Sequence, residues 1–310
     1  MSFEYVCFSG GGIRGLMYLG VLSALETHYD FKNKLSNVRG FAGTSVGALV
    51  SLALMLELSS HEIKEVLWPI VSSLRNIAPH LDISLLISNY GLDDGTSLKN
   101  AIKNILRRGG LSDECTFKDL KRLIKKEFVC CTTNLNTKKV EYLRAETHEN
   151  LRVSDAIFMS MCVPFLFAPV EYKKSLYVDG ALSLNVPECF QSESTMYFMF
   201  DTYGRVNAIT NWNEYLESVF ACGIECQESR VEKLVLSSKH CCVLKMPEIL
   251  RNDSSLNLNI HQSAIRQYIL CGYSAGISYV FPFFTSTIEM VLVFVIHSLR
   301  KVLENSLDAN

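Results

Sequence analysis

Three short apolar runs in this sequence each end in a turn of small residues. The turns cover residues 10–15, 43–47 and 179–181. After the first two turns, apolar residues recur at helical spacing, so each segment is predicted to be a strand, a tight turn and a helix. Strands that alternate with helices predict an α/β fold, in which helices cover both faces of a mostly parallel sheet. Because sites in such sheets lie at the carboxyl ends of the strands, these turns are the first places to look for function.

The same patterns continue along the chain. Apolar runs bounded by turn residues predict strands over 3–9, 38–42, 127–135, 175–187 (ending in a turn) and 195–200. Periodic apolar residues predict helices over 14–26, 46–58, 61–70, 96–109, 115–126 and 152–164. In the fifth of these helices, Thr116 and Asp119 have the spacing of a capping box.

Length and charge exclude several classes of protein. The chain has 310 residues, of which 48% are hydrophobic, and this suits one large α/β domain or two small ones, with a single core as the simpler interpretation. Its net charge of −2 predicts no nucleic-acid partner. The basic runs at 106–108 and 118–126 lie next to acidic residues at helical spacing, so we interpret them as solvated helix faces.

The cysteines indicate a reducing environment. There are eleven, an odd number, without a C-x-x-C pair and without the Cys/His spacing of a zinc site. The first residues have neither a basic segment nor a long apolar one, as a secretory signal would. We therefore expect reduced thiols, no metal and an intracellular location.

The second turn contains a candidate nucleophile. Ser45 lies between Gly43 and Gly47 in "GTSVG", which matches G-x-S-x-G, with a strand before it and an apolar helix after it. In that context the serine occupies a strained turn that projects its hydroxyl into a cleft, and the helix N-terminus favours developing negative charge. The structural alternative is a helix N-cap serine beside packing glycines.

A serine nucleophile needs a base. Of the later histidines, His240, His261 and His297, none lies in a strand-end loop with small neighbours, so structural roles are expected for them. Asp179 follows an apolar strand and precedes Gly180 and Ala181. A carboxylate there could accept the serine proton directly. The alternative for Asp179 is an ordinary Asp-Gly turn.

The first turn, "GGGIRG", could supply backbone donors. Its G-x-G-x-x-G spacing would suit a dinucleotide site, but no acidic residue ends the second strand. No lysine follows the glycines, as a phosphate-binding loop requires. The remaining use is a row of backbone N–H groups aimed at one point, which is an oxyanion hole, with Arg14 orienting the loop.

Together and in this order, "GGGIRG", "GTSVG" and "DGA" resemble the motifs of the patatin-like phospholipases. The segments 91–98, 116–120, 132–135, 160–170 and 264–276 resemble weaker features of that family. The resemblance implies a three-layer α/β sandwich with a central, mostly parallel sheet. It implies a catalytic domain over 3–190, continued by 191–276.

The resemblance also assigns roles to residues. Ser45 would be the nucleophile and Asp179 the base, with Gly43 and Gly47 forming the nucleophile elbow. The oxyanion hole would be formed by Gly10, Gly11, Gly12, Arg14 and Gly15, and the third motif would add Gly180 and Ala181. The substrates would be lipid acyl esters, most often phospholipids, and no metal or organic cofactor would be needed. Residues 160–164 are bulkier than is usual in the family, which would narrow the acyl channel.

Residues 277–299 form an apolar C-terminal segment, predicted to be a helix. Within it, 279–296 is just long enough to span a bilayer, but Glu289 and Pro282 weaken that interpretation. A membrane span, an interfacial helix and a helix packed on the core all remain open. The first two would place the protein at a membrane surface, which we expect for an enzyme of membrane lipids.

Three hypotheses follow from the sequence. The first is a serine lipid acyl hydrolase that uses a Ser-Asp dyad, with acyl transfer to another alcohol as a variant. The second is an α/β-hydrolase esterase with a Ser-His-Asp triad, in which His240 or His261 would be essential. The third is a non-catalytic lipid-binding protein on the same scaffold.

Overall fold

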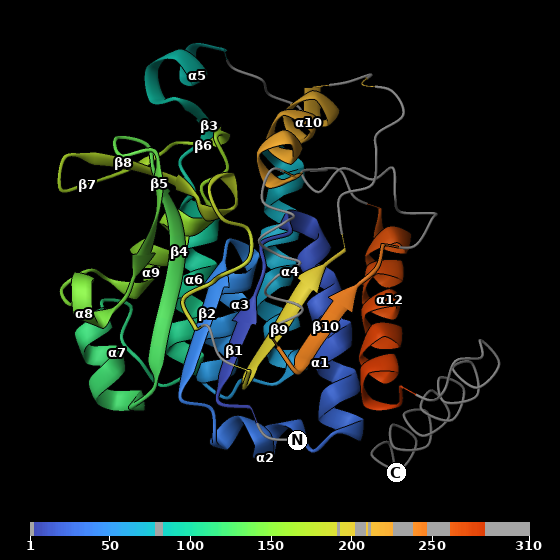
Figure 1. The fold of residues 1–310 in the computed structure, drawn as a ribbon. Helices are drawn as coiled ribbons and strands as arrows, with labels where there is room; N and C mark the ends of the chain where they lie inside the picture. Colours follow the sequence, from blue (N-terminus) through green and yellow to red (C-terminus); the bar gives the residue numbers. More distant parts are fainter. Residues whose placement is uncertain are drawn as a thin grey trace, which may run out of the picture.

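The computed structural model describes residues 3–77, 83–190, 193–201, 209, 212–225, 238–246 and 261–282. Within these residues the chain forms an eight-stranded, mostly parallel sheet flanked by helices (Figure 1). The strand order is β10-β9-β1-β2-β4-β8-β7, and β5 pairs with β4. The predicted α/β fold is therefore confirmed.

Five strands of the sheet are parallel, namely β1 (Tyr5–Phe8), β2 (Gly40–Thr44), β4 (Glu127–Asn134), β9 (Thr195–Phe200) and β10 (His240–Leu244). Three are antiparallel to a neighbour, namely β5 (Lys139–Leu143), β7 (Val170–Tyr172) and β8 (Ser175–Asp179). A separate two-stranded sheet pairs β3 (Gly91–Asp93) with β6 (Phe165–Phe167). The patterns did not predict β3, β5, β6, β7 or β10.

The helices up to the third motif are α1 (Leu16–His28), α2 (Phe31–Ser36), α3 (Val46–Met55), α4 (Ser60–Ile77), α5 (Ile83–Asn89), α6 (Thr96–Arg108), α7 (Phe117–Ile124), α8 (Ala145–His148) and α9 (Val153–Met161). Short 3₁₀ turns, η1 (Gly12–Gly15) and η2 (Gly180–Leu182), follow β1 and β8, and α10 (Trp212–Glu225) and α12 (Gln262–Val280) come later. The predicted capping box at Thr116 and Asp119 is present and begins α7.

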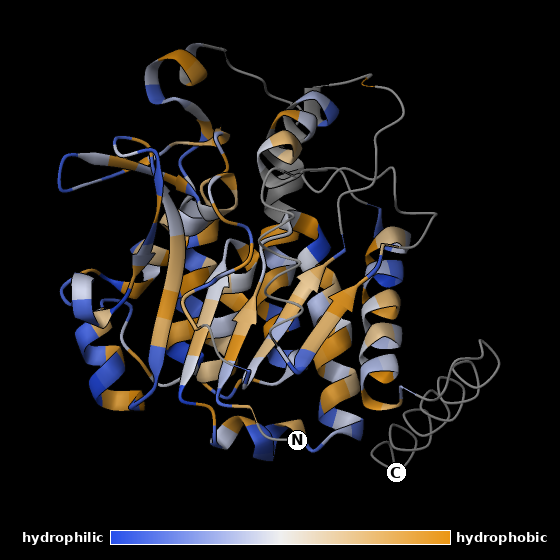
Figure 2. Ribbon diagram, in the orientation of Figure 1, coloured by the Kyte–Doolittle hydropathy of each residue, from blue (hydrophilic) through white to orange (hydrophobic). Residues whose placement is uncertain are grey.

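Alternation along the central strands divides the core into two. On β1, Val6 and Phe8 face the larger core, whereas Cys7 faces a smaller one on the other side of the sheet. Helices α1, α3, α4, α6 and α9 supply most of the larger core. Hydropathy colouring shows apolar residues along the central strands and on the helices behind them (Figure 2). Val186 and Phe190, which follow the third motif, pack in the smaller core. The third motif is thereby held against the central strands.

Helix α12 packs closely against α1. A Cβ on Gly20 would lie 1.9 Å from the carbonyl oxygen of Ile269, and one on Gly272 would lie 1.9 Å from that of Met17. Such a close backbone approach admits only glycine at both positions. The contact attaches the last described helix to the helix that follows the glycine loop.

The predicted apolar tail lies mostly outside the described residues. Helix α12 continues through Gly276 to Val280, so 277–280 are the last turn of a helix that begins at Gln262. Residues 283–299, which include most of the candidate span 279–296, are not described. None of the helices in the described ranges combines the length and apolar character needed to cross a bilayer.

Candidate active site

Strands β2 and β8 meet end to end along one edge of β4. Strand β5 pairs with residues 130–134 of β4 and so occupies one edge of that strand. Strand β2 pairs with residues 127–131 of β4, and β8 pairs with residues 132–134. Because both stretches overlap the one that β5 covers, β2 and β8 lie on the opposite edge. Thr44, the last residue of β2, is level with Cys131, and Asp179, the last residue of β8, is level with Thr132. Because the two strands run in opposite directions, their carboxyl ends converge. Ser45 and Asp179 are therefore brought together from positions 134 residues apart in the chain.

Ser45 stands in a strained turn between β2 and α3. Its φ of 55° lies in the left-handed region, which costs a non-glycine residue on the order of 1–3 kcal/mol. A Cβ on Gly43 would lie 2.3 Å from the backbone of Gly47, and one on Gly47 would lie 2.5 Å from the carbonyl oxygen of Phe8. Both glycines thus permit the tight crossing that turns the Ser45 hydroxyl away from strand and helix.

Ser160, at the end of α9, holds this turn in place. The backbone N–H of Ser45 donates to Ser160 Oγ at 2.8 Å, and Ser160 Oγ donates to the carbonyl of Cys131. The side chain therefore links the nucleophile turn to β4. This role of Ser160 could not be predicted from its place in the family-like stretch 160–170, because the contacts join it to distant segments.

The Ser45 hydroxyl donates to Asp179 Oδ2 at 2.6 Å. The other carboxylate oxygen, Oδ1, accepts the backbone N–H of Ala181 at 2.8 Å. Both side chains are buried, with Ser45 6% and Asp179 5% exposed. Burial raises the pKa of Asp179 from 3.8 to about 6, although the hydrogen bonds from Ser45 and Ala181 act in the opposite direction.

The residues after Asp179 fix its carboxylate. A Cβ on Gly180 would lie 2.3 Å from the carbonyl oxygen of Cys131, so the backbone passes against β4. Thr133 Oγ1 donates to the carbonyl of Asp179 at 2.9 Å, and the N–H of Asp179 donates to Cys162 at 2.8 Å. Asp179 is thus held through both its main-chain carbonyl and its main-chain N–H.

The glycine loop supplies fewer donors than its sequence suggests. The N–H of Gly10 donates to the carbonyl of Asn185 at 3.1 Å, and the N–H of Arg14 donates to Gly11 at 3.0 Å. Gly15 lies within η1 and packs against Val46, because a Cβ at this position would lie 2.5 Å from Val46 Cγ2. In the described part of the chain, the N–H groups of Gly11 and Gly12 have no acceptor.

The side chains around the loop limit its shape. A Cβ on Gly10 would lie 2.7 Å from Asn185 Oδ1 and 3.3 Å from Ser45 Cβ, so the loop passes directly beside the candidate nucleophile. The Arg14 side chain is buried rather than exposed to solvent. Asn185 follows the third motif, and its contact with the loop is a second feature that sequence reasoning did not find.

The histidines named by the alternative mechanism lie elsewhere. His240 begins β10 and pairs with Met196, near the start of β9, whereas Ser45 follows the carboxyl end of β2. His261 is exposed and precedes α12, and His297 lies outside the described residues. Within the described ranges, the hydrogen bonds to the Asp179 carboxylate come only from Ser45 and Ala181.

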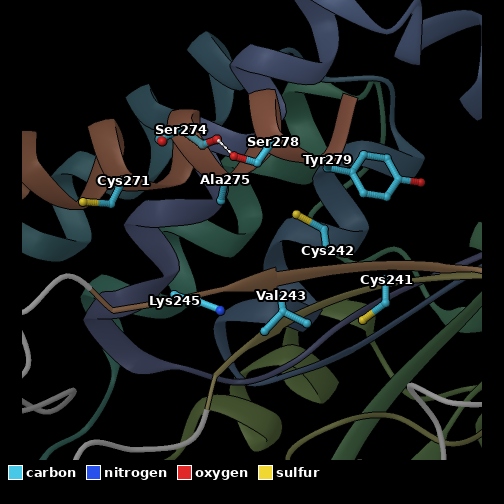
Figure 3. Close-up of a pocket in the computed structure, with 9 residues that line it drawn as sticks. All are labelled: Cys241, Cys242, Val243, Lys245, Cys271, Ser274, Ala275, Ser278 and Tyr279. Atoms are coloured by element: carbon cyan, nitrogen blue, oxygen red, sulfur yellow. Dashed lines mark hydrogen bonds between the residues drawn. The ribbon is translucent and has the colours of Figure 1, made fainter. Parts of the chain in front are cut away.

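A cavity of about 490 Å³ lies between β10 and α12 (Figure 3). Its lining includes three thiols, those of Cys241, Cys242 and Cys271. Burial raises the pKa of Cys241 to about 11 and that of Cys242 to about 12. These thiols are protonated at neutral pH and are therefore poor nucleophiles. Across the described residues, no group of three or more His, Cys, Asp or Glu side chains is arranged to hold a metal ion.

The patatin-like phospholipase family model matches residues 6–188. Protein R571 of Acanthamoeba polyphaga mimivirus is 28% identical over 182 residues, which are 59% of this chain and 59% of the relative. The probable lipid hydrolase 463L of Invertebrate iridescent virus 6 is 24% identical over 192 residues, 60% of this chain and 62% of the relative. The chain thus spans about six tenths of the length of these relatives.

Two solved structures share the fold. VipD from Legionella pneumophila has a TM-score of 0.60 at 16% identity, covering 90% of this chain and 67% of VipD. The type III effector protein ExoU has a TM-score of 0.50 at 13% identity, covering 90% of this chain and 53% of ExoU. At these identities the likeness concerns the fold.

Ser160→Ala is expected to destabilise the protein, because the buried N–H of Ser45 loses its acceptor. The expected loss in the free energy of unfolding, measured in urea, is about 1–3 kcal/mol. Ser154→Ala is the matched control on the same helix, since its buried hydroxyl has no partner among the described residues and its removal should change stability little. Equal losses in the two variants would contradict the role given to Ser160.

Asp179→Asn is expected to stabilise the protein in a pH-dependent manner. The carboxyl has a pKa of about 6 in the folded protein, against an ordinary value of 3.8. The free-energy cost of burying its ionised form therefore grows from pH 3.8 to pH 6 and is constant at higher pH. Urea unfolding should show a gain of about 3 kcal/mol at pH 8 and about a third of that at pH 4.5. A gain independent of pH would contradict the raised pKa.

Proposed function

Since the chain belongs to the patatin-like phospholipase family, we propose that it is a serine lipid acyl hydrolase that cleaves acyl esters of membrane lipids, an activity of the phospholipase A type. The observation that supports this best is the 2.6 Å hydrogen bond from Ser45 Oγ to Asp179 Oδ2. A hydroxyl that already donates to a carboxylate can lose its proton as it attacks an ester.

In the first step, Ser45 Oγ attacks the ester carbonyl carbon and its proton passes to Asp179 Oδ2. The pKa of about 6 makes this carboxylate a stronger base than an ordinary aspartate, while it stays ionised at neutral pH. The bond to the alcohol of the lipid then breaks, and that oxygen takes the proton back from Asp179. The products are a lysolipid and an acyl group bonded to Ser45.

The negative charge that develops on the carbonyl oxygen needs donors. We assign them to the N–H groups of Gly11 and Gly12, which follow directly after Gly10, the loop residue that lies beside Ser45. Gly10 has a structural role in this assignment, because its N–H is bonded to Asn185. Gly15 has a packing role against Val46, and Arg14, whose side chain is buried, orients the loop.

In the second step, water replaces the lipid alcohol. The water oxygen attacks the acyl carbon while Asp179 accepts a proton from the water. The bond to Ser45 Oγ then breaks, and Ser45 takes that proton from Asp179. A fatty acid is released and the dyad is restored. A second alcohol in place of water would give acyl transfer by the same steps. All groups that move are supplied by the dyad, the ester and water, so the proposal includes no cofactor.

Three related assignments belong to the same proposal. The substrate is an ester of a bilayer lipid, most often a phospholipid, which would make the reaction one of lipid degradation. The enzyme works inside the cell at a membrane surface, without a nucleic-acid partner. The histidine-dependent esterase and the non-catalytic lipid-binding protein are the rivals that its tests must separate.

Ser45→Ala and Asp179→Asn are each expected to lower acyl release from mixed phospholipid vesicles by at least about a thousandfold, because each removes one half of the dyad. The release would be followed as free fatty acid. His240→Ala and His261→Ala are the controls and should retain activity. Loss of activity in a folded histidine variant would favour the histidine-dependent esterase. A biological effect that survives Ser45→Ala would favour the non-catalytic protein.

The pH dependence of kcat/KM should report the Asp179 carboxyl. Because the ionised form is the base, activity on a soluble ester should be constant above about pH 7 and fall tenfold per pH unit below about pH 6. Circular dichroism at each pH would show that the protein stays folded. Full activity at pH 4.5 would mean that Asp179 is not the base or that its pKa is not raised.

A further inference from the structure

Helices α5 and α10 lie at the end of the molecule to which the parallel strands point (Figure 1). Both regions expose apolar side chains. On α10, Tyr215 and Val219 are each 49% exposed and lie one turn apart on the same side of the helix. At α5, Ile87 is 74% exposed, and Tyr90, directly after the helix, is 64% exposed. Exposed apolar groups that gather at one end of a protein mark an interaction surface.

These helices are attached to the candidate site. Helix α10 packs against η2, the turn that follows Asp179, and Gly223 lies close to the carbonyl of Leu182. Helix α5 leads into β3, which pairs with β6 through Gly91 and Phe165. Strand β6 follows α9 and Ser160, and Phe165 is itself exposed. A surface that covers α5 and α10 would therefore lie at the same end of the molecule as the dyad.

Two hairpin turns at the same end carry positive charge. Lys138 and Lys139 lie at the turn between β4 and β5, and Lys173 and Lys174 form the turn between β7 and β8. All four side chains are exposed, and Glu171 on β7 is an exposed acid beside them. Figure 2 shows the β7–β8 turn as hydrophilic, in contrast to the apolar residues of α5 and α10.

We propose that this end of the molecule docks onto an anionic lipid bilayer. The docking face is defined as Ile87, Tyr90, Phe165, Tyr215 and Val219, together with Lys138, Lys139, Lys173 and Lys174. The inference rests on the proposed function, since it assigns how that site reaches a substrate held in a membrane. The apolar side chains enter the region between head groups and acyl chains, and the lysines bind anionic head groups.

The composition favours a bilayer over a protein partner. Residues 83–90 contain no charged side chain, and a charge there would oppose insertion. Tyrosine places its ring in apolar surroundings and its hydroxyl in water, as an interface requires. The apolar side chains stand on separate elements, and a fluid bilayer can accept separate protrusions. The four lysines of the two hairpin turns match the negative charge of an anionic leaflet.

The test measures co-sedimentation with vesicles of phosphatidylcholine that contain one fifth phosphatidylserine, or none. The apolar variants are Tyr215→Ser with Val219→Ser, and Ile87→Ser with Tyr90→Ser. The charge variant is Lys173→Gln with Lys174→Gln. Each apolar pair should weaken binding to the anionic vesicles at least tenfold. The charge variant should lose most of the preference for anionic over neutral vesicles.

Leu123→Ser is the matched control, because Leu123 is 53% exposed on α7, away from the docking face. It should bind vesicles as the wild type does. All of these variants should hydrolyse a soluble short-chain ester at the wild-type rate, since none touches the dyad. The proposal is overturned if the apolar pairs bind like the wild type, or if Leu123→Ser loses as much binding. It is also overturned if these residues instead mediate self-association, measured by sedimentation without lipid.

Ser45→Ala separates this inference from the proposed function. It should bind vesicles as the wild type does while releasing no fatty acid. A wild type that hydrolyses no ester but binds vesicles through the docking face would refute the proposed activity and leave the docking inference standing. A wild type that hydrolyses the soluble ester but binds vesicles independently of this face would refute the docking inference and leave the proposed activity standing.

Discussion

The hydrogen bond between Ser45 and Asp179 depends on two strands that end against each other on one edge of β4. Strand β2 approaches from one direction and β8 from the other, so a hydroxyl and a carboxylate from distant parts of the chain meet at 2.6 Å. The glycine loop, the third motif and α9 all contact this junction. A shift of β8 by one residue would turn Asp179 to the other face of the sheet, because successive side chains of a strand alternate.

The site stores unfavourable energy that the rest of the fold offsets. Ser45 has a strained backbone, and Asp179 is a buried carboxylate whose pKa is raised by desolvation. Main-chain hydrogen bonds, the Ser160 hydroxyl and two apolar cores keep both residues in place. The same burial that destabilises the charged carboxylate makes it a stronger base. Stability and the proposed chemistry are therefore opposed at this residue.

Local patterns were sufficient for much of the fold. The buried strands β1, β2, β4 and β9 and the capped helix α7 follow from apolar runs and end signals that lie within a few residues. The strands β5, β7 and β10 were missed because they are short and partly polar or lie at the sheet edge, where pairing rather than composition defines them. The antiparallel direction of β8 could not be predicted from the sequence either, because the direction of a strand is defined only by the strands with which it pairs.

The residue types at the turns can be read from the amino-acid order alone: a serine between two glycines, an aspartate before a small-residue pair, and a run of glycines after the first strand. These are local steric requirements, and each can be recognised within six residues. Three hydrogen bonds are set by the packing of the whole fold. Ser45 donates to Asp179, the N–H of Ser45 donates to Ser160, and the N–H of Gly10 donates to the carbonyl of Asn185. Those contacts join segments far apart in the chain, and strand register and helix packing, which no local pattern encodes, set their distances.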